Sequence, residues 1–175
     1  SGIGSAPAAH GFGFAAQIVA SNARARAAAA QAALDEGLAV HRNEEALHDD
    51  LAALAAHCGP RIRAMAPGAI ILGGEPTVRL PEAPGRGGRN QALALALAEH
   101  IAGVEGLCVV VGGTDGSDGP TDAAGGIVDG ATWGDGAAEA ARAADSGRYL
   151  ERCGALLVTG PTGTNVMDLL VAVRM

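Results

Sequence analysis

Two short apolar runs, each ending in a glycine pair, constrain the fold of this chain most strongly. Ala69–Leu72 runs into Gly73-Gly74, and Leu107–Val111 runs into Gly112-Gly113. Continuous apolar runs of this length are typical of strands buried on both faces. The stretch between them, Arg89 to Ile101, carries apolar residues at helical spacing. A strand, a helix and a second strand in this order predict an α/β fold.

Further elements are expected on both sides of this unit. Ser21 or Asn22 should cap an Ala-rich helix that stops at Gly37, and Asn43 should cap a second helix. Additional strands are expected at Phe14–Ala20, Leu38–His41, Thr77–Leu80, Ile127–Val128, Ala155–Thr159 and Leu169–Val173, with a helix at Ala137–Ala144 and a turn or helix near Tyr149. We therefore expect residues 18–175 to form one three-layer α/β/α domain with a mixed, mostly parallel sheet, and residues 1–17 to be a flexible tail or the remnant of an upstream domain.

Charge and composition exclude several classes of function. The formal net charge is −7, which argues against a general nucleic-acid binder, because affinity for the phosphate backbone requires a basic surface. No apolar stretch approaches the roughly 18 residues of a membrane span, and no signal peptide is recognisable. These features predict a cytoplasmic protein. All twelve basic residues are arginines, so chemistry that needs a lysine would have to find it on another segment.

The first of three polar loops near strand ends, residues 85–91, is rich in glycine and arginine. Gly87 and Gly88 allow close approach of the backbone to a ligand, and the helix that follows offers unpaired N–H groups. Arg86 and Arg89 supply planar donors for phosphate or carboxylate oxygens. These residues fit an anion-binding loop and a solvated loop with ordinary surface arginines equally well.

The second loop, residues 112–122, carries Asp115, Asp118 and Asp122 within eight residues. Carboxylates this close repel one another unless a cation, hydrogen-bond donors or water compensates. Mg²⁺ is the natural candidate, since it binds one or two carboxylates together with water and phosphate oxygens. The alternative is a pair of Asp-Gly turns in which the aspartates accept local backbone N–H groups. The residues of this loop by themselves favour that alternative slightly.

The third loop, residues 159–165, contains Thr162 and Asn165 among glycines. These residues could contact an oxyanion, but an ordinary tight turn is the better explanation of them. The charges of the first two loops differ in sign: residues 61–89 hold five Arg against two Glu, and residues 105–145 hold one Arg against eight acids. A cationic loop facing an anionic loop is the arrangement that a metal–phosphate ligand requires.

Four ordered motifs together resemble the MOFRL domain, the carboxy-terminal part of glycerate kinases, some of which are labelled hydroxypyruvate reductase. The motifs are GGEPTV from Gly73, GRGGRNQ from Gly85, GTDGSDGPTDAAG from Gly113 and TGPTGTNVMDL from Thr159. The resemblance is strong over residues 69–175 and extends more loosely to about Ile18.

The resemblance implies phosphorylation of D-glycerate with ATP and Mg²⁺, typically to 2-phosphoglycerate, in a cleft between two domains. The other domain, an amino-terminal Rossmann-like one, would bring a catalytic lysine, so this segment alone should be inactive. An exposed cleft face is prone to self-association, which makes a homodimer one expected assembly. The chain begins at Ser1 without Met, as expected of a fragment.

The expected site combines residues of all three loops. The catalytic candidates are Arg86, Arg89 and Asp122. The candidates for substrate or phosphate contacts are Glu75, Gly87, Gly88, Asn90, Thr114, Thr162 and Asn165. The metal candidates are Asp115 and Asp118. Two other functions stay open: an oxidoreductase, although no G-x-G-x-x-G motif follows a strand, and a non-catalytic anion-binding module.

Overall fold

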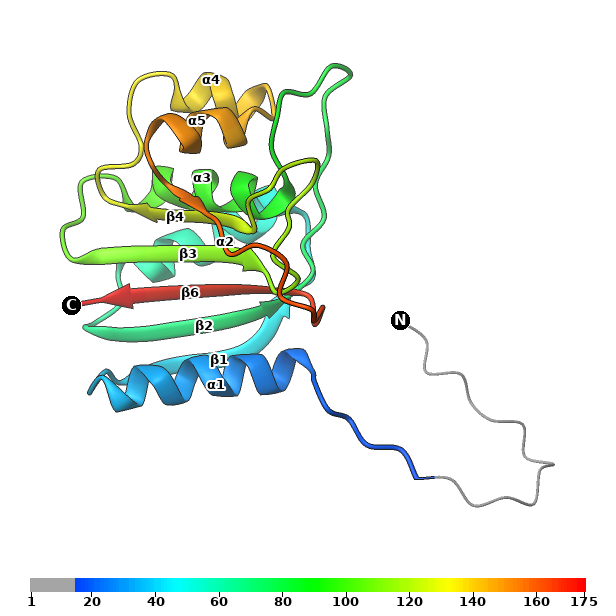
Figure 1. The fold of residues 1–175 in the computed structure, drawn as a ribbon. Coiled ribbons are helices and arrows are strands. Elements are labelled where there is room, and N and C mark those ends of the chain that lie inside the picture. The colour runs from blue at the N-terminus through cyan, green and yellow to red at the C-terminus, as the bar shows by residue number, and fades with distance from the viewer. Residues whose placement is uncertain (1–14) are drawn as a thin grey trace.

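The computed structural model describes residues 15–175 (Figure 1). The elements in chain order are α1 (Asn22–Asp35), β1 (Val40–Leu47), α2 (Leu51–Arg63), β2 (Gly68–Gly74), α3 (Arg89–Ile101), β3 (Leu107–Gly113), β4 (Gly125–Asp129), α4 (Ala137–Arg142), α5 (Ser146–Arg152), β5 (Leu156–Leu157) and β6 (Asp168–Arg174). Most of the predicted tail, residues 1–14, lies outside the described part, and residues 15–17 have no regular secondary structure.

One six-stranded sheet has the order β1-β2-β6-β3-β4-β5. Only β1 and β2 pair in parallel; the other four neighbouring pairs are antiparallel. The predicted mixed sheet is confirmed, but the expectation of a mostly parallel sheet is wrong. The reason is the last strand, because β6 inserts between β2 and β3 and runs against both of them.

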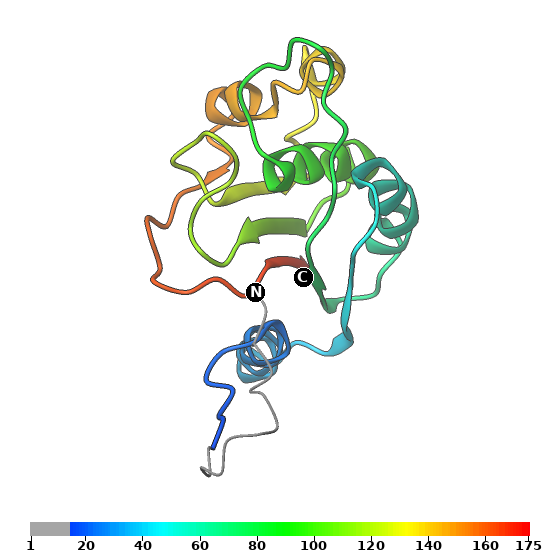
Figure 2. The same cartoon turned by 90° about the vertical axis from the view of Figure 1, so that its right-hand side faces the viewer.

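Helices cover both faces of the sheet, which confirms the three layers (Figures 1 and 2). On β2, Ala69 and Ile71 point towards α1, whereas Ile70 and Leu72 join the larger core under α2 and α3. This split follows from the period of two along a strand. Helices α4 and α5 pack on the outer side of α3 (Figure 2). Among residues 15–175, no helix is both long and apolar enough to cross a bilayer.

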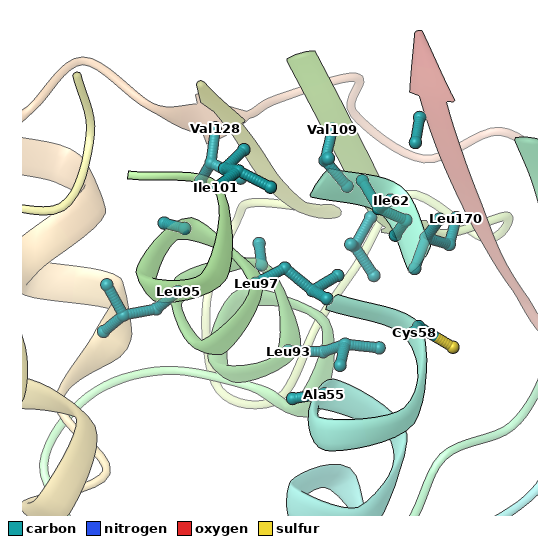
Figure 3. Packing of buried hydrophobic residues seen from close by; sticks show 14 of the residues in the cluster. Ala55, Cys58, Ile62, Leu93, Leu95, Leu97, Ile101, Val109, Val128 and Leu170 are labelled. Atoms are coloured by element: carbon teal, nitrogen blue, oxygen red, sulfur yellow. The ribbon is translucent and has the colours of Figure 1, made fainter. Parts of the chain in front are cut away.

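The main core lies between the sheet and the helices α2 and α3 (Figure 3). The predicted apolar face of α3 is confirmed, since Leu93, Leu97 and Ile101 are fully buried. They pack with Val109 of β3 and Leu170 of β6 (Figure 3). This packing fixes α3 against the middle of the sheet and thereby sets the position of the first turn of the helix.

The ends of α1 follow the predicted capping pattern. The hydroxyl of Ser21 accepts a hydrogen bond from the Arg24 N–H, and Gly37 lies just beyond the helix with a φ of 77°. A positive φ at this position is the usual reason for glycine at a helix end. Both predicted signals for this helix are therefore confirmed.

Three local predictions are wrong. The segment after Asn43 belongs to β1, and the second helix starts only at Leu51, where the Asp50 side chain caps it. Thr77 forms only an isolated bridge with Asp50, so no strand covers Thr77–Leu80. Residues 15–20 of the predicted first strand are irregular. Most side chains of these segments are exposed, so their sequence pattern does not distinguish strand, helix and loop.

The sheet brings three strand ends to one point of its rim. β2 ends at Gly74 and β3 ends at Gly113, and both glycines pair with Asp168, the first residue of β6. Asp168 therefore lies between the carboxyl ends of two strands. Ligand sites of open α/β sheets commonly occupy such a position.

Candidate functional site

The two oppositely charged loops meet at this rim, as the sequence predicted. A Cβ added to Gly88 would lie 2.3 Å from Cγ of Asp118, and one added to Gly119 would lie 2.7 Å from the Gly87 carbonyl oxygen. Real Cβ atoms do not approach other atoms this closely, so glycine is needed at both positions. The close approach of the two backbones is thus built into the sequence.

Asp118 forms the link between the second loop and α3. Its carboxylate accepts hydrogen bonds from the backbone N–H groups of Asn90 (3.0 Å) and Gln91 (2.8 Å), in the first turn of the helix. The residue is 3% exposed. Burial raises the pKa of Asp118, and the hydrogen bonds from Gln91 and Asn90 oppose that rise. Both carboxylate oxygens are thus engaged in holding the start of α3.

Replacing Asp118 by alanine should therefore destabilise the protein. Two buried N–H groups would lose their acceptor, and we expect the free energy of unfolding to fall by roughly 2–3 kcal/mol. Asp122→Ala is the matched control, because Asp122 is exposed and should change stability by less than about 0.5 kcal/mol. Urea denaturation of both variants measures the difference; equal losses would contradict the capping role of Asp118.

Arg89, the first residue of α3, forms ion pairs with two carboxylates. Its Nε donates to Oδ2 of Asp168 at 2.8 Å, and its NH1 donates to Oε1 of Glu75 at 3.0 Å. The Asp168 side chain is 3% exposed and that of Glu75 is 55% exposed. Burial raises the pKa of Asp168 although Arg89 counteracts it. Burial alone would lower the pKa of Arg89, but the hydrogen bonds and charges of Asp168 and Glu75 together raise it.

Asp168 is the site residue that the sequence predictions missed. The Asn22 side chain donates to its carbonyl oxygen at 3.1 Å. The preceding residue, Met167, has a φ of 69°, a left-handed conformation that is unusual for a side chain other than glycine. The Thr114 hydroxyl donates to the Met167 carbonyl at 2.7 Å and accepts from the Val166 N–H at 2.8 Å. The backbone before Asp168 is therefore fixed from two sides.

The third loop is tied to the second by its polar side chains. The Thr162 hydroxyl donates to the Thr114 carbonyl, and Nδ2 of Asn165 donates to Oδ2 of Asp115 at 3.3 Å. Asn165 and Asp115 both line the cavity at this rim, whereas Thr114 and Thr162 do not. Thr114 and Thr162 thus hold loops together, which is a different task from the ligand contact expected of them.

Two of the predicted catalytic residues lie outside the cavity at this rim. NH1 of Arg86 donates to Oε2 of Glu151 on α5 at 3.0 Å, and Asp122 is exposed. Neither residue lines the cavity. Of the predicted catalytic residues, the structure therefore places only Arg89 there.

The cavity beside Arg89 has a volume of about 360 Å³, within the range of small-molecule sites. Its apolar lining includes Val78, Leu80 and Pro120. The polar lining comes from Gly87, Gly88, Arg89, Asn90, Asp115, Ser117, Asp118, Ser146, Asn165 and Asp168. One arginine faces three aspartates, so an anionic ligand entering here needs a further cation for charge balance.

The fit to Mg²⁺ differs between the two predicted metal residues. Asp118 is buried and both its oxygens accept backbone N–H groups of α3. Asp115 is only partly buried; its Oδ1 accepts the Ser117 N–H at 3.0 Å, and among the described residues its Oδ2 accepts only from the exposed Asn165 side chain. Within residues 15–175, no group of three or more His, Cys, Asp or Glu is arranged to hold a metal. Asp115 fits as a single carboxylate ligand to an ion that brings its other ligands with it.

Comparisons with known proteins identify a family and several relatives of this chain. The model of the MOFRL family matches residues 68–168. The chain is 50% identical over 111 residues to the D-glycerate 2-kinase of Thermotoga maritima, covering 60% of this chain and 26% of that protein. It is 37% identical over 168 residues to a protein of Agrobacterium vitis named putative hydroxypyruvate reductase, covering 87% and 38%.

A solved structure also has this fold. The crystal structure of the glycerate kinase of Thermotoga maritima matches with a TM-score of 0.84 and 36% identity, covering 89% of this chain and 41% of that one. The chain thus spans less than half of the length of each of these relatives.

Proposed function

The chain belongs to the MOFRL family, and on this basis we propose that it is the carboxy-terminal portion of an ATP-dependent glycerate kinase. The substrate would be D-glycerate and the product 2-phosphoglycerate, which the 50% identity to a D-glycerate 2-kinase supports. A cytoplasmic location fits this activity.

One observation carries the proposal: a single arginine, fixed by a buried aspartate, lines a cavity where three loops meet at the sheet rim. Guanidinium N–H groups match the oxygens of phosphate and carboxylate. In phosphoryl transfer, positioning and charge stabilisation supply most of the catalysis. Arg89 would stabilise the charge of the transferring phosphoryl group or hold the glycerate carboxylate.

The other residues would orient Arg89 and its ligands. Asp168 would keep the guanidinium aimed at the cavity, and Asn90 and Asn165 would contact the substrate or the nucleotide. Asp115 would hold the Mg²⁺ that arrives with ATP; when bound, that ion supplies neutralisation of phosphate charge. Gly87 and Gly88 line the cavity, so their backbone would be available to the phosphate, while the space that a Cβ would need is filled by Ser146 and Asp118.

The excess of carboxylates around the cavity supports a site that another domain completes. One arginine against three aspartates does not balance an anionic substrate, and this chain has no lysine. We propose that an amino-terminal Rossmann-like domain closes a cleft over this rim and brings the missing cation. This segment alone would then be inactive, and a homodimer through its uncovered cleft face would be one assembly of it.

The test is an assay of the complete gene product with ATP, Mg²⁺ and D-glycerate, coupled to enolase, which accepts 2-phosphoglycerate directly. The proposal expects ATP-dependent turnover without added phosphoglycerate mutase; turnover only with mutase would indicate 3-phosphoglycerate instead. The name of the Agrobacterium vitis relative motivates a parallel assay of NADH oxidation with hydroxypyruvate. Reductase activity without kinase activity would overturn the proposal, and calorimetric binding of anions without either activity would favour a non-catalytic module.

A further inference from the structure

We propose that Glu75 occupies on Arg89 the position of the substrate oxyanion and is displaced when the substrate binds, whereas Asp168 remains as the permanent anchor. Glu75 would thus compete with phosphate or carboxylate for the same guanidinium. The identity of the oxyanion rests on the proposed function, but the competition itself does not.

The hydrogen bonds of Arg89 divide into an inner and an outer set. Asp168 takes the inner edge, with Nε at 2.8 Å from Oδ2 and NH2 at 3.4 Å from Oδ1. Glu75 takes NH1 at 3.0 Å. These bonds use three of the five N–H groups of Arg89 and leave one on NH1 and one on NH2. An oxyanion that binds this pair lies against the carboxylate of Glu75 on NH1, and two adjacent anions repel each other. The exposed carboxylate of Glu75 is the one expected to leave.

Asp168 cannot readily give way. Its side chain is 3% exposed, and its backbone is paired with Gly74 on one side and Gly113 on the other. Asn22 holds its carbonyl oxygen as well. Removing the cation from a buried carboxylate is strongly unfavourable, so the inner edge of the guanidinium should stay occupied during substrate binding.

Glu75 can give way at little cost. Its side chain is 55% exposed, and within residues 15–175 its carboxylate has no hydrogen-bond partner other than Arg89. Exposed ion pairs of this kind contribute little to stability. The residue follows Gly74, whose φ of 143° lies outside the range that other residues readily adopt. Glycine at position 74 thus allows the backbone conformation at the end of β2 from which Glu75 reaches Arg89.

The competition predicts an effect of unusual sign. Glu75→Gln keeps the size of the side chain but removes its charge, so inorganic phosphate should bind about two- to fivefold more tightly than to the wild type. Glu82→Gln is the matched control, because it removes the same charge from an exposed residue of the same loop that has no ion-pair partner within the described chain. The control should leave the phosphate affinity at the wild-type value.

The measurement is an NMR titration of this chain with inorganic phosphate, following the Nε–H signal of Arg89, which is assigned by its loss in Arg89→Lys. Millimolar affinities are accessible in this way. A tighter response in Glu75→Gln and an unchanged one in Glu82→Gln would support the proposal. Equal or weaker binding by Glu75→Gln, an equal gain in both variants, or no response of Arg89 to phosphate in any of them would overturn it.

The outcome is separable from that of the kinase assay, because no phosphoryl transfer is measured. If Glu75→Gln binds phosphate more tightly but the complete enzyme has no kinase activity, only the proposed function is refuted. An active kinase without the gain would remove only the role of Glu75.

Discussion

Replacing Arg89 by alanine should lower kcat/KM for D-glycerate phosphorylation by roughly 10³-fold in the complete enzyme. Arg89 is the only basic residue among those lining the cavity in the described chain, so no neighbour can take over its charge. Arg89→Lys keeps a positive charge beside Asp168 but loses the planar fork of donors, and its loss should be smaller, about 10- to 100-fold. Steady-state kinetics with the enolase-coupled assay measures both variants.

Arg86→Ala is the matched control, since Arg86 lies three residues away in the same loop but contacts Glu151 on α5. We expect its kcat/KM to stay within about threefold of the wild type, because exposed ion pairs contribute little. Arg89→Ala leaves Asp168 buried without its cation, so the thermal unfolding midpoint of each variant must be compared with its activity. A large loss in Arg86→Ala with a small one in Arg89→Ala would reverse the assignment.

Replacing Gly88 by alanine should have the largest effect on stability, roughly 3–5 kcal/mol. Gly88 precedes α3 in an extended conformation that any residue adopts, with φ of −129°, so backbone strain plays no part. The added methyl group would lie 2.3 Å from Cγ and 2.5 Å from the backbone carbon of Asp118. It must push the second loop away and break the hydrogen bonds that Asp118 accepts from α3.

Gly134→Ala provides the control, because the nearest atom to its added Cβ is 3.8 Å away and the change should cost less than about 1 kcal/mol. Urea denaturation of the two variants gives the comparison. If Gly88→Ala retained wild-type stability, the direct contact between the two loops would be refuted. The double variant Gly88→Ala/Asp118→Ala should lose less than the sum of the single losses, since both break the same contact.

A helix or strand could be predicted where the residues that determine it lie within the same segment. The α3 helix begins and ends as predicted, at Arg89 and Ile101, because its apolar spacing and the glycines before it act within one segment. The β1 strand could not be predicted, since Asn43 followed by two glutamates also fits the start of a helix. Only the pairing of this segment with β2 selects the strand. The antiparallel insertion of β6 depends on contacts between residues about one hundred positions apart.

The same distinction holds for the site. The meeting of the glycine–arginine loop with the aspartate loop was predictable from charge, and the structure confirms it. The different roles of the aspartates were not predictable. Asp118 and Asp122 look alike in the sequence, yet Asp118 caps a helix and Asp122 is exposed. Asp168 was overlooked because an acid at a strand start carries no local signal of its partner 79 positions away. An acid directly before a buried run, within a motif of the family, is the signal that could have found it.

The most direct test of the site is chemical rescue of Arg89→Ala by free guanidinium in the complete enzyme. The replaced side chain leaves a space bordered by the carboxylates of Asp168 and Glu75, which would attract the cation. We predict that guanidinium restores a measurable part of the glycerate phosphorylation activity of Arg89→Ala in a saturable manner and does not stimulate Arg86→Ala or the wild type. Wild-type activity of Arg89→Ala without guanidinium, or a loss that guanidinium does not relieve in a correctly folded variant, would contradict a catalytic guanidinium at this rim.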